Sequence, residues 1–229
     1  MLDVNNTIDL VKLKLYNEWL YTSHIQAETD TEYHKALTEN AVKNYIDPLN
    51  LPKDAVILDV ACGPGYFLDI MKERGYTNVV GINLSPEDLN ICTSKGHKVK
   101  QYDMSFLPQK DGFIDESVDL IFCRQALEHS PYPLFTLMEY NRLLKQPGYL
   151  YVETPAIDTD RKHEFYANHY SVLGTTQLGA LLQRTGFNIN TFNVVDFNLK
   201  MQADDGSEQI VKDKAYCVIT NKQRPLDIK

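Results

Sequence analysis

The sequence lacks the features of a membrane-inserted or disulfide-bonded protein. No apolar run approaches the roughly 20 residues that cross a bilayer, and the N-terminal segment has no basic stretch followed by an apolar core, as a signal peptide would. The four cysteines are far apart and form no CxxC pair, which argues against a zinc site and a disulfide framework. We therefore expect a cytoplasmic protein without a membrane partner.

Positive charge is also scarce. Lys and Arg number 23 against 31 Asp and Glu, so the formal net charge is −8. A surface of that sign repels phosphate backbones, and broad electrostatic docking on nucleic acid is therefore not expected. We expect a small-molecule partner and no nucleic acid. Nothing in the sequence indicates an oligomeric state.

The length of 229 residues suits one domain with an appendage. The segment PLNLP at 48–52 marks a boundary, and before it residues 7–46 place apolar side chains at helical spacing. We expect residues 1–50 to form an N-terminal helical cap and residues 51–229 to form the main domain. The aromatic residues of the cap either close over a ligand as a lid or only pack the helices onto the sheet. These residues are Tyr16, Trp19, Tyr21 and Tyr33.

After residue 55 short apolar runs alternate with helical stretches. The pattern predicts strands at 55–61, 77–83, 98–103, 117–123, 149–155, 187–200 and 215–220, with helices at 65–75, 133–144 and 175–186 and a further helix capped by Ser85. Such alternation with fully apolar strands predicts a parallel sheet covered on both faces, and the two late strands are expected to pair antiparallel. A ligand should bind beyond the carboxyl ends of the strands.

The segment ILDVACGPG at 57–65 is the strongest candidate for a binding site. Asp59 is a carboxylate in an apolar strand, while Gly63 and Gly65 allow a tight turn into a helix. The third glycine of a dinucleotide fingerprint would fall at Leu68, so GxGxxG is not satisfied. A carboxylate just before the glycines suits a ligand with an ammonium group; the alternative is a buried Asp that caps its own turn.

Two more strand ends carry candidate ligand contacts. Asn83 follows the second strand, where nucleotide-binding folds hold the ribose hydroxyls, although it also fits a turn before a helix cap. Asp103 and Met104 end the third strand and suit an adenine edge and ring face.

With these segments in place, the chain resembles class I S-adenosylmethionine-dependent methyltransferases of the small-molecule, type 11/23-like branch. The resemblance covers residues 53–220 and rests on LDVACGPG, VVGINLSPEDL, QYDMSFLP, SVDLIFCRQALEHSPYP and EYNRLLKQPGYLYVETP, in that order. It implies an α/β fold, a Rossmann-like three-layer sandwich with a seven-stranded, mostly parallel sheet whose last strand is antiparallel. It also implies S-adenosyl-L-methionine as the cofactor and S-adenosyl-L-homocysteine as the product.

The resemblance assigns ten positions to the cofactor. Asp59, Ala61, Gly63 and Gly65 would surround the methionine moiety, Asn83 and Leu84 would flank ribose and adenine, Asp103 and Met104 would hold adenine, and the backbone at Cys123 and Arg124 would face the methionine end. Asn83 departs from the usual Asp or Glu of the family.

His129, in the loop after the fourth strand, is the candidate catalytic residue. Methyl transfer from a sulfonium depends mostly on placement, and a base is needed only if the acceptor loses a proton. The alternative is a histidine that only braces its loop. Glu128 is expected to point elsewhere.

Some methyltransferases of this class bind a divalent metal through an ExxEH pattern, but here the loop reads QALEH. Because Gln125 replaces the first carboxylate, we expect no metal. His163 and His169 are either substrate contacts or surface residues.

These features favour S-adenosylmethionine-dependent methyl transfer to a hydroxyl or amine of a small molecule. A non-catalytic S-adenosylmethionine-binding regulatory subunit and a nicotinamide-dependent oxidoreductase are the alternatives.

Overall fold

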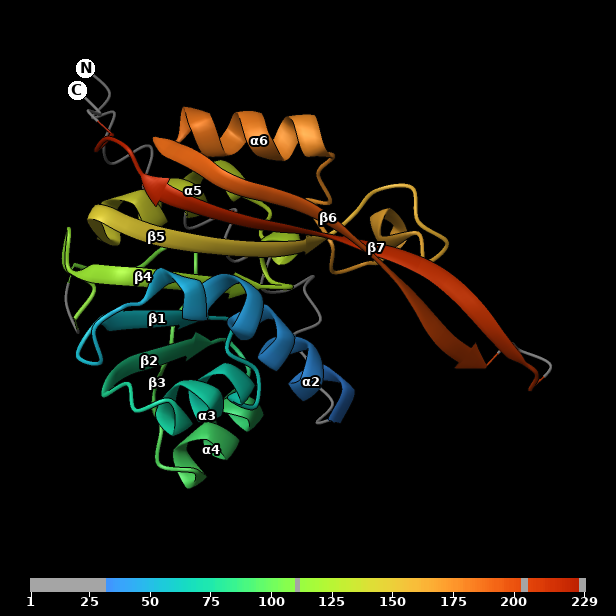
Figure 1. Cartoon of the computed structure of the whole chain (residues 1–229), viewed down its shortest axis with the longest axis horizontal. Coiled ribbons are helices and arrows are strands. Elements are labelled where there is room, and N and C mark those ends of the chain that lie inside the picture. The colour runs from blue at the N-terminus through green and yellow to red at the C-terminus, as the bar shows by residue number, and fades with distance from the viewer. Residues whose placement is uncertain (1–31, 110–111, 203–205, 227–229) are drawn as a thin grey trace, which may run out of the picture.

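A seven-stranded sheet forms the centre of the computed structural model, which describes residues 32–109, 112–202 and 206–226 (Figure 1). The strand order is β3-β2-β1-β4-β5-β7-β6. The strands are β1 Val56–Val60, β2 Asn78–Asn83, β3 Lys98–Gln101, β4 Val118–Arg124, β5 Leu144–Pro155, β6 Phe187–Gln202 and β7 Glu208–Lys222. All neighbours from β3 to β5 pair parallel, whereas β7 is antiparallel to both β5 and β6. The predicted fold class is thereby confirmed.

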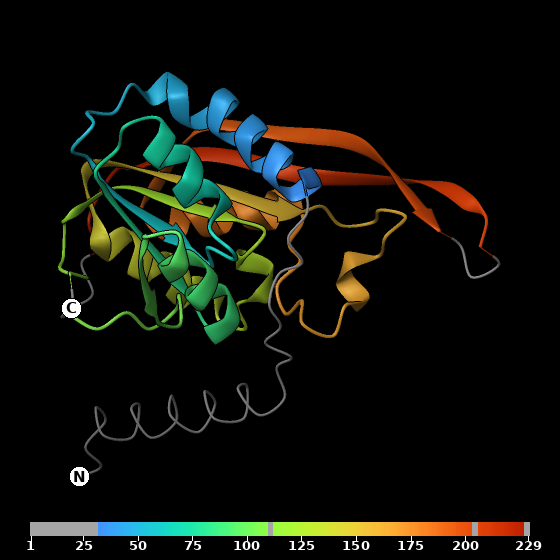
Figure 2. The same ribbon diagram turned by 90° about the horizontal axis from the view of Figure 1, so that it is seen from below.

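Helices cover both faces of this sheet. The helix α2 (Glu32–Ala41) and the helix α3 (Tyr66–Glu73) lie on one face, and α5 (Pro133–Leu143) and α6 (Thr175–Arg184) lie on the other (Figure 2). The remaining α-helix of the described ranges, α4 (Pro86–Ser94), follows β2. Short π or 3-10 turns are η1 Val42–Ile46, η2 Asp47–Leu49, η3 Leu127–His129 and η4 His163–Phe165.

The apolar character of the central strands follows from this double coverage. In β4, Leu120 and Phe122 belong to the core beneath α2 and α3, while Ile121 and Cys123 belong to the core beneath α5 and α6. A strand buried on both faces needs an apolar residue at every position, not at alternate ones. This explains why the run 117–123 could be identified from the sequence.

The start of α4 also agrees with the sequence. The Ser85 side chain accepts a hydrogen bond from the Asp88 backbone N–H at 3.3 Å, and Pro86 occupies the first turn. An N-cap of this kind satisfies one of the backbone N–H groups that the first helical turn leaves unpaired.

The strand β7 begins earlier than the sequence pattern predicts. Its pairing with β5 ends at Ala215, but its ladder with β6 continues to Glu208, so a two-stranded hairpin projects beyond the end of β5 (Figure 1). Most side chains of residues 208–212 are exposed. Because neither face of this part is buried, the sequence carries no apolar alternation by which to predict it.

Of the predicted cap at 1–50, the structure describes residues 32–50, so Tyr16, Trp19 and Tyr21 lie outside the described residues. Ala41, Val42 and Ile46 are buried in the same core as residues of β1, α3 and β4. The domain boundary and the lid remain predictions. Within the described ranges no helix is long and apolar enough to cross a bilayer.

Replacing Phe122 by alanine should lower the free energy of unfolding by about 3–5 kcal/mol. The ring is stacked between Phe67, at a centroid distance of 3.9 Å, and Tyr151, at 5.0 Å, so its removal leaves a cavity. Urea denaturation measures the change. Phe165→Ala is the matched control, because that ring is 85% exposed, and it should change the free energy by less than about 0.5 kcal/mol. Equal effects of the two variants would contradict the stacking of the Phe122 ring between Phe67 and Tyr151.

Candidate active site

The carboxyl ends of β1, β2 and β4 bring several of the predicted site residues to one edge of the sheet. Asp59 lies in β1 between Gly81 of β2 and Phe122 of β4, and it is only 3% exposed. A carboxylate is rarely buried among apolar strands without a specific function or partner. Its position fits the predicted contact with an ammonium group.

The turn after β1 has backbone conformations with positive φ angles, which glycine adopts without strain. Ala61, Gly63 and Gly65 all have positive φ angles, of 53°, 50° and 91°. A Cβ atom at Gly65 would lie 2.9 Å from the Cys92 Sγ, so only glycine fits there without a shift. The Cys62 N–H donates to the Ile82 carbonyl at 3.0 Å, which ties the turn to β2. The turn thus leads the chain into α3 at the edge where the predicted cofactor residues lie.

Asn83 is held by its own turn. Its side-chain oxygen accepts from the Leu84 N–H at 2.7 Å, and its side-chain nitrogen donates to an Asp88 carboxylate oxygen at 3.0 Å. The side chain therefore organises the start of α4. The predicted contact of Asn83 and Leu84 with ribose and adenine stays a prediction, and both residues are half-buried at the strand end.

Asp103 and Met104 lie in the turn after β3. Asp103 is buried and accepts a hydrogen bond from the Ser105 N–H at 2.7 Å, and its burial raises the pKa of its carboxyl group. The hydroxyl of Ser105 lies 2.7 Å from that of Thr136 and 3.2 Å from that of Ser130. These hydroxyl groups connect the predicted adenine side with the loop that carries His129.

At the end of β4 the two predicted residues differ in the direction of their side chains. Cys123 is buried in the core beneath α5, where burial raises the pKa of its thiol to about 12, so only its backbone is available to a ligand. Arg124 forms an ion pair with Glu153 of β5 at 3.0 Å. Gln125 also donates to a Glu153 carboxylate oxygen, at 3.2 Å. The side chain of Gln125 is therefore directed to β5.

His129 is fixed in orientation at the end of η3. Its Nδ1 lies 2.9 Å from the Asn168 carbonyl oxygen, and because a carbonyl only accepts, Nδ1 carries the proton and Nε2 the lone pair. Burial lowers the pKa of the ring below its usual value, so the imidazole is neutral near pH 7.

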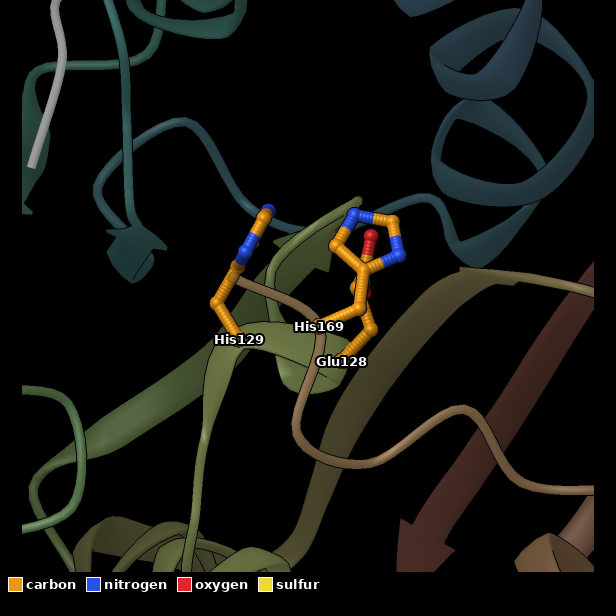
Figure 3. A group of neighbouring side chains, drawn as sticks. All are labelled: Glu128, His129 and His169. Atoms are coloured by element: carbon orange, nitrogen blue, oxygen red, sulfur yellow. The ribbon is translucent and has the colours of Figure 1, made fainter. Parts of the chain in front are cut away.

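The structure also brings together residues that the sequence did not connect. The candidate ligand atoms of Glu128, His129 and His169 all lie within 4.8 Å of one another (Figure 3). The expectation that Glu128 points away from His129 is therefore wrong. Burial raises the pKa of Glu128 to about 8. No local pattern could have linked His169 to this loop, because its segment has no periodicity and lies 40 residues further along the chain.

The comparison with known proteins defines the class. Residues 21–191 match the family described as a methyltransferase domain, and the chain belongs to that family. A putative methyltransferase from Bacillus halodurans shares the fold, with a TM-score of 0.67 and 18% identity over 81% of this chain and 100% of that chain. The predicted class, a methyltransferase domain with the fold of S-adenosylmethionine-dependent methyltransferases, is thus confirmed.

Curated relatives carry a more specific name. A tRNA U34 carboxymethyltransferase from Shewanella frigidimarina is 33% identical over 141 residues, which are 58% of this chain and 40% of that protein. The protein of the same name from Aliarcobacter butzleri is 28% identical over 171 residues, 70% of this chain and 55% of that protein. The chain thus spans about half the length of these relatives.

These names overturn the expectation of a small-molecule acceptor and no nucleic-acid partner, because both relatives are named for a tRNA substrate. The physical reason for the error is that a net charge of −8 is an average over the whole chain. Recognition of a polymer depends on the local surface around the site and not on that average.

Replacing Asn83 by aspartate should lower the free energy of unfolding by about 1–3 kcal/mol. The change turns the donor to Asp88 into a second carboxylate beside it, and like charges at this distance repel. Asn90→Asp adds the same charge at an exposed position of α4 and should change stability by less than about 0.5 kcal/mol. Urea denaturation at neutral pH distinguishes the two variants. Unchanged stability with tighter S-adenosylhomocysteine binding would mean that residue 83 faces the ribose instead.

Proposed function

We propose that this chain transfers a methyl group from S-adenosylmethionine to a polar atom, a hydroxyl or an amine, of a nucleoside in tRNA. The observation that carries the proposal is that Asp59, near the carboxyl end of β1, and His129, after the neighbouring strand β4, belong to the same edge of the sheet. One supplies a carboxylate for the donor and the other an imidazole nitrogen for the acceptor. The names of the curated relatives support tRNA as the acceptor class.

The residues on the donor side fit the cofactor. The Asp59 carboxylate would receive the methionine ammonium, Gly63 and Gly65 would let the cofactor approach the backbone of the turn 61–65, and the 103–104 turn would contact adenine. The cofactor, when bound, supplies an electrophilic methyl group on a sulfonium. When the acceptor atom attacks this methyl group in line with the breaking carbon–sulfur bond, the sulfur loses its positive charge. The chain's own contribution is to hold the two reactants in line, because placement accounts for most of the rate in such a transfer.

On the acceptor side we assign His129 a direct role. Its Nδ1 donates to Asn168, so the neutral ring presents Nε2 as a lone pair. That lone pair can take a proton from the acceptor or bind a cation.

The acceptor side is connected to the β6–β7 hairpin through histidine rings. Asp213, on the projecting part of β7, lies 3.0 Å from the ring of His163, and the His163 ring stacks on His169 beside His129. Because His163 and Asp213 are both buried, these contacts fix the position of His169 beside His129.

The Asp59→Ala variant should bind S-adenosylhomocysteine about 10- to 100-fold more weakly, since a hydrogen bond to a charged group contributes about 1.5–3 kcal/mol. Isothermal titration calorimetry measures this. Asp54→Ala, at an exposed position just before β1, is the matched control and should bind as tightly as the wild type. An Asp59→Ala variant that keeps wild-type affinity would remove this residue from the donor site.

The function itself can be tested with labelled methyl donor and bulk tRNA. The wild type should place label in a tRNA nucleoside, and mass spectrometry of the digested nucleosides tells methyl from carboxymethyl, the group named for the relatives. His129→Ala should lower the rate by at least about 100-fold without weakening S-adenosylhomocysteine binding. Label only in a ribonuclease-resistant fraction would refute tRNA as the acceptor. Cofactor binding with no turnover on any acceptor would indicate a regulatory subunit.

A further inference from the structure

We propose that Glu128, His129 and His169 bind a divalent transition-metal ion, such as Zn²⁺, Mn²⁺ or Co²⁺. Figure 3 shows Glu128 and His129 on one segment and His169 on another that passes beside it. This site goes beyond the proposed methyl transfer and does not depend on it.

The composition and spacing of the group suit such an ion. Two imidazoles and one carboxylate are ligands of zinc, manganese, cobalt and iron(II) more than of magnesium or calcium. In a tetrahedral site, metal–ligand bonds of about 2.0–2.2 Å put the ligand atoms about 3.3–3.6 Å apart. The three ligand atoms lie within 4.8 Å of one another, so side-chain movements of about 1 Å would complete the site.

His129 is arranged as metal-bound histidines usually are. Its Nδ1 donates to the Asn168 carbonyl at 2.9 Å and leaves Nε2 for a ligand. A ring N–H held by a backbone carbonyl fixes the tautomer and directs the other nitrogen at the metal. His169 offers a second ring nitrogen, because its buried Nδ1 has no hydrogen-bond partner among the described residues.

Glu128 supplies an independent reason for a cation. The residue is 1% exposed, and within the described ranges its Oε2 atom has no hydrogen-bond partner. A buried carboxylate oxygen without a partner costs free energy, and a bound cation would remove that cost.

The two segments that carry the ligands are fastened to each other by the backbone. The Glu128 carbonyl accepts from the N–H groups of Tyr170 and Ser171 at 2.7 and 3.0 Å, and the Ser171 hydroxyl donates to the Ser130 carbonyl. The ligands are therefore brought together before any ion binds, which reduces the entropy lost on binding.

Gln125 does not take part, because its side chain donates to Glu153. The expectation of no metal considered only this position in the QALEH segment and could not include His169. Three protein ligands leave at least one position for water or an acceptor atom, as in catalytic zinc sites.

The test uses full-length protein without a histidine tag, treated with a chelator and titrated with Co²⁺ and with Zn²⁺. We expect one ion per chain by calorimetry and visible absorption bands of Co²⁺ in a site of low symmetry. His169→Ala and Glu128→Gln should each weaken binding by at least about 10- to 100-fold, the loss reported even for residues that only orient a ligand. His34→Ala removes a histidine outside the group and should leave the affinity unchanged.

Two outcomes would overturn the proposal. One is the absence of a Co²⁺ spectrum and of Zn²⁺ binding in the chelator-treated wild type. The other is wild-type affinity in the Glu128 and His169 variants. S-adenosylhomocysteine binding is measured in the same samples without metal. It shows whether each variant is folded and has an intact donor site, independently of the metal. A failure of the proposed methyl transfer can therefore be distinguished from a failure of the metal site. If His169→Ala does not fold, His169→Gln takes its place.

Discussion

The turn between β1 and α3 is the constraint on which the rest of the site depends. Gly65 leaves no room for a side chain because Cys92 of α4 lies against it. The Cys92 thiol donates to the Gly63 carbonyl at 3.3 Å, and the Lys95 ammonium donates to the Pro64 carbonyl at 2.8 Å. The shape of the turn is therefore set by the neighbouring β–α unit as well as by its own glycines. These contacts tie the turn after β1 to the helix after β2, at the edge of the sheet to which the buried Asp59 belongs.

The sequence predicts the central strands and the start of α4 well and the exposed hairpin and the histidine cluster poorly, and the difference has a physical cause. Strands such as 117–123 are buried on both faces, so an unbroken apolar run identifies them, and Ser85 follows the chemistry of helix caps. The first half of β7 is exposed on both faces and carries no such pattern. The link between His169 and Glu128 depends on long-range backbone contacts, which local spacing does not encode.

The same division explains why the cofactor could be inferred and the acceptor could not. The positions assigned to the donor belong to strand ends and tight turns, whose residue types are restricted by backbone geometry and burial. The segments that we propose for the acceptor side are the irregular stretch 156–174 and the β6–β7 hairpin, where many sequences satisfy the same backbone. Net charge could not replace this missing information, because it averages over faces that never meet the acceptor.

The projecting hairpin makes the sheet unequal in local stability along its own length. From Ala215 onward β7 has strands on both sides, whereas between Glu208 and Lys214 its ladder is with β6 alone. The segment after β5 anchors part of this stretch, because the N–H groups of Ala156 and Asp160 donate to the carbonyls of Lys214 and Lys212. A two-stranded ribbon is only marginally stable by itself, so opening of the amide hydrogen bonds should be easiest between Glu208 and Val211 and should stop near Lys212. Asp213, which is bonded to His163, lies on the more stable side of that limit. The histidine cluster is thus fastened to the anchored part of the hairpin.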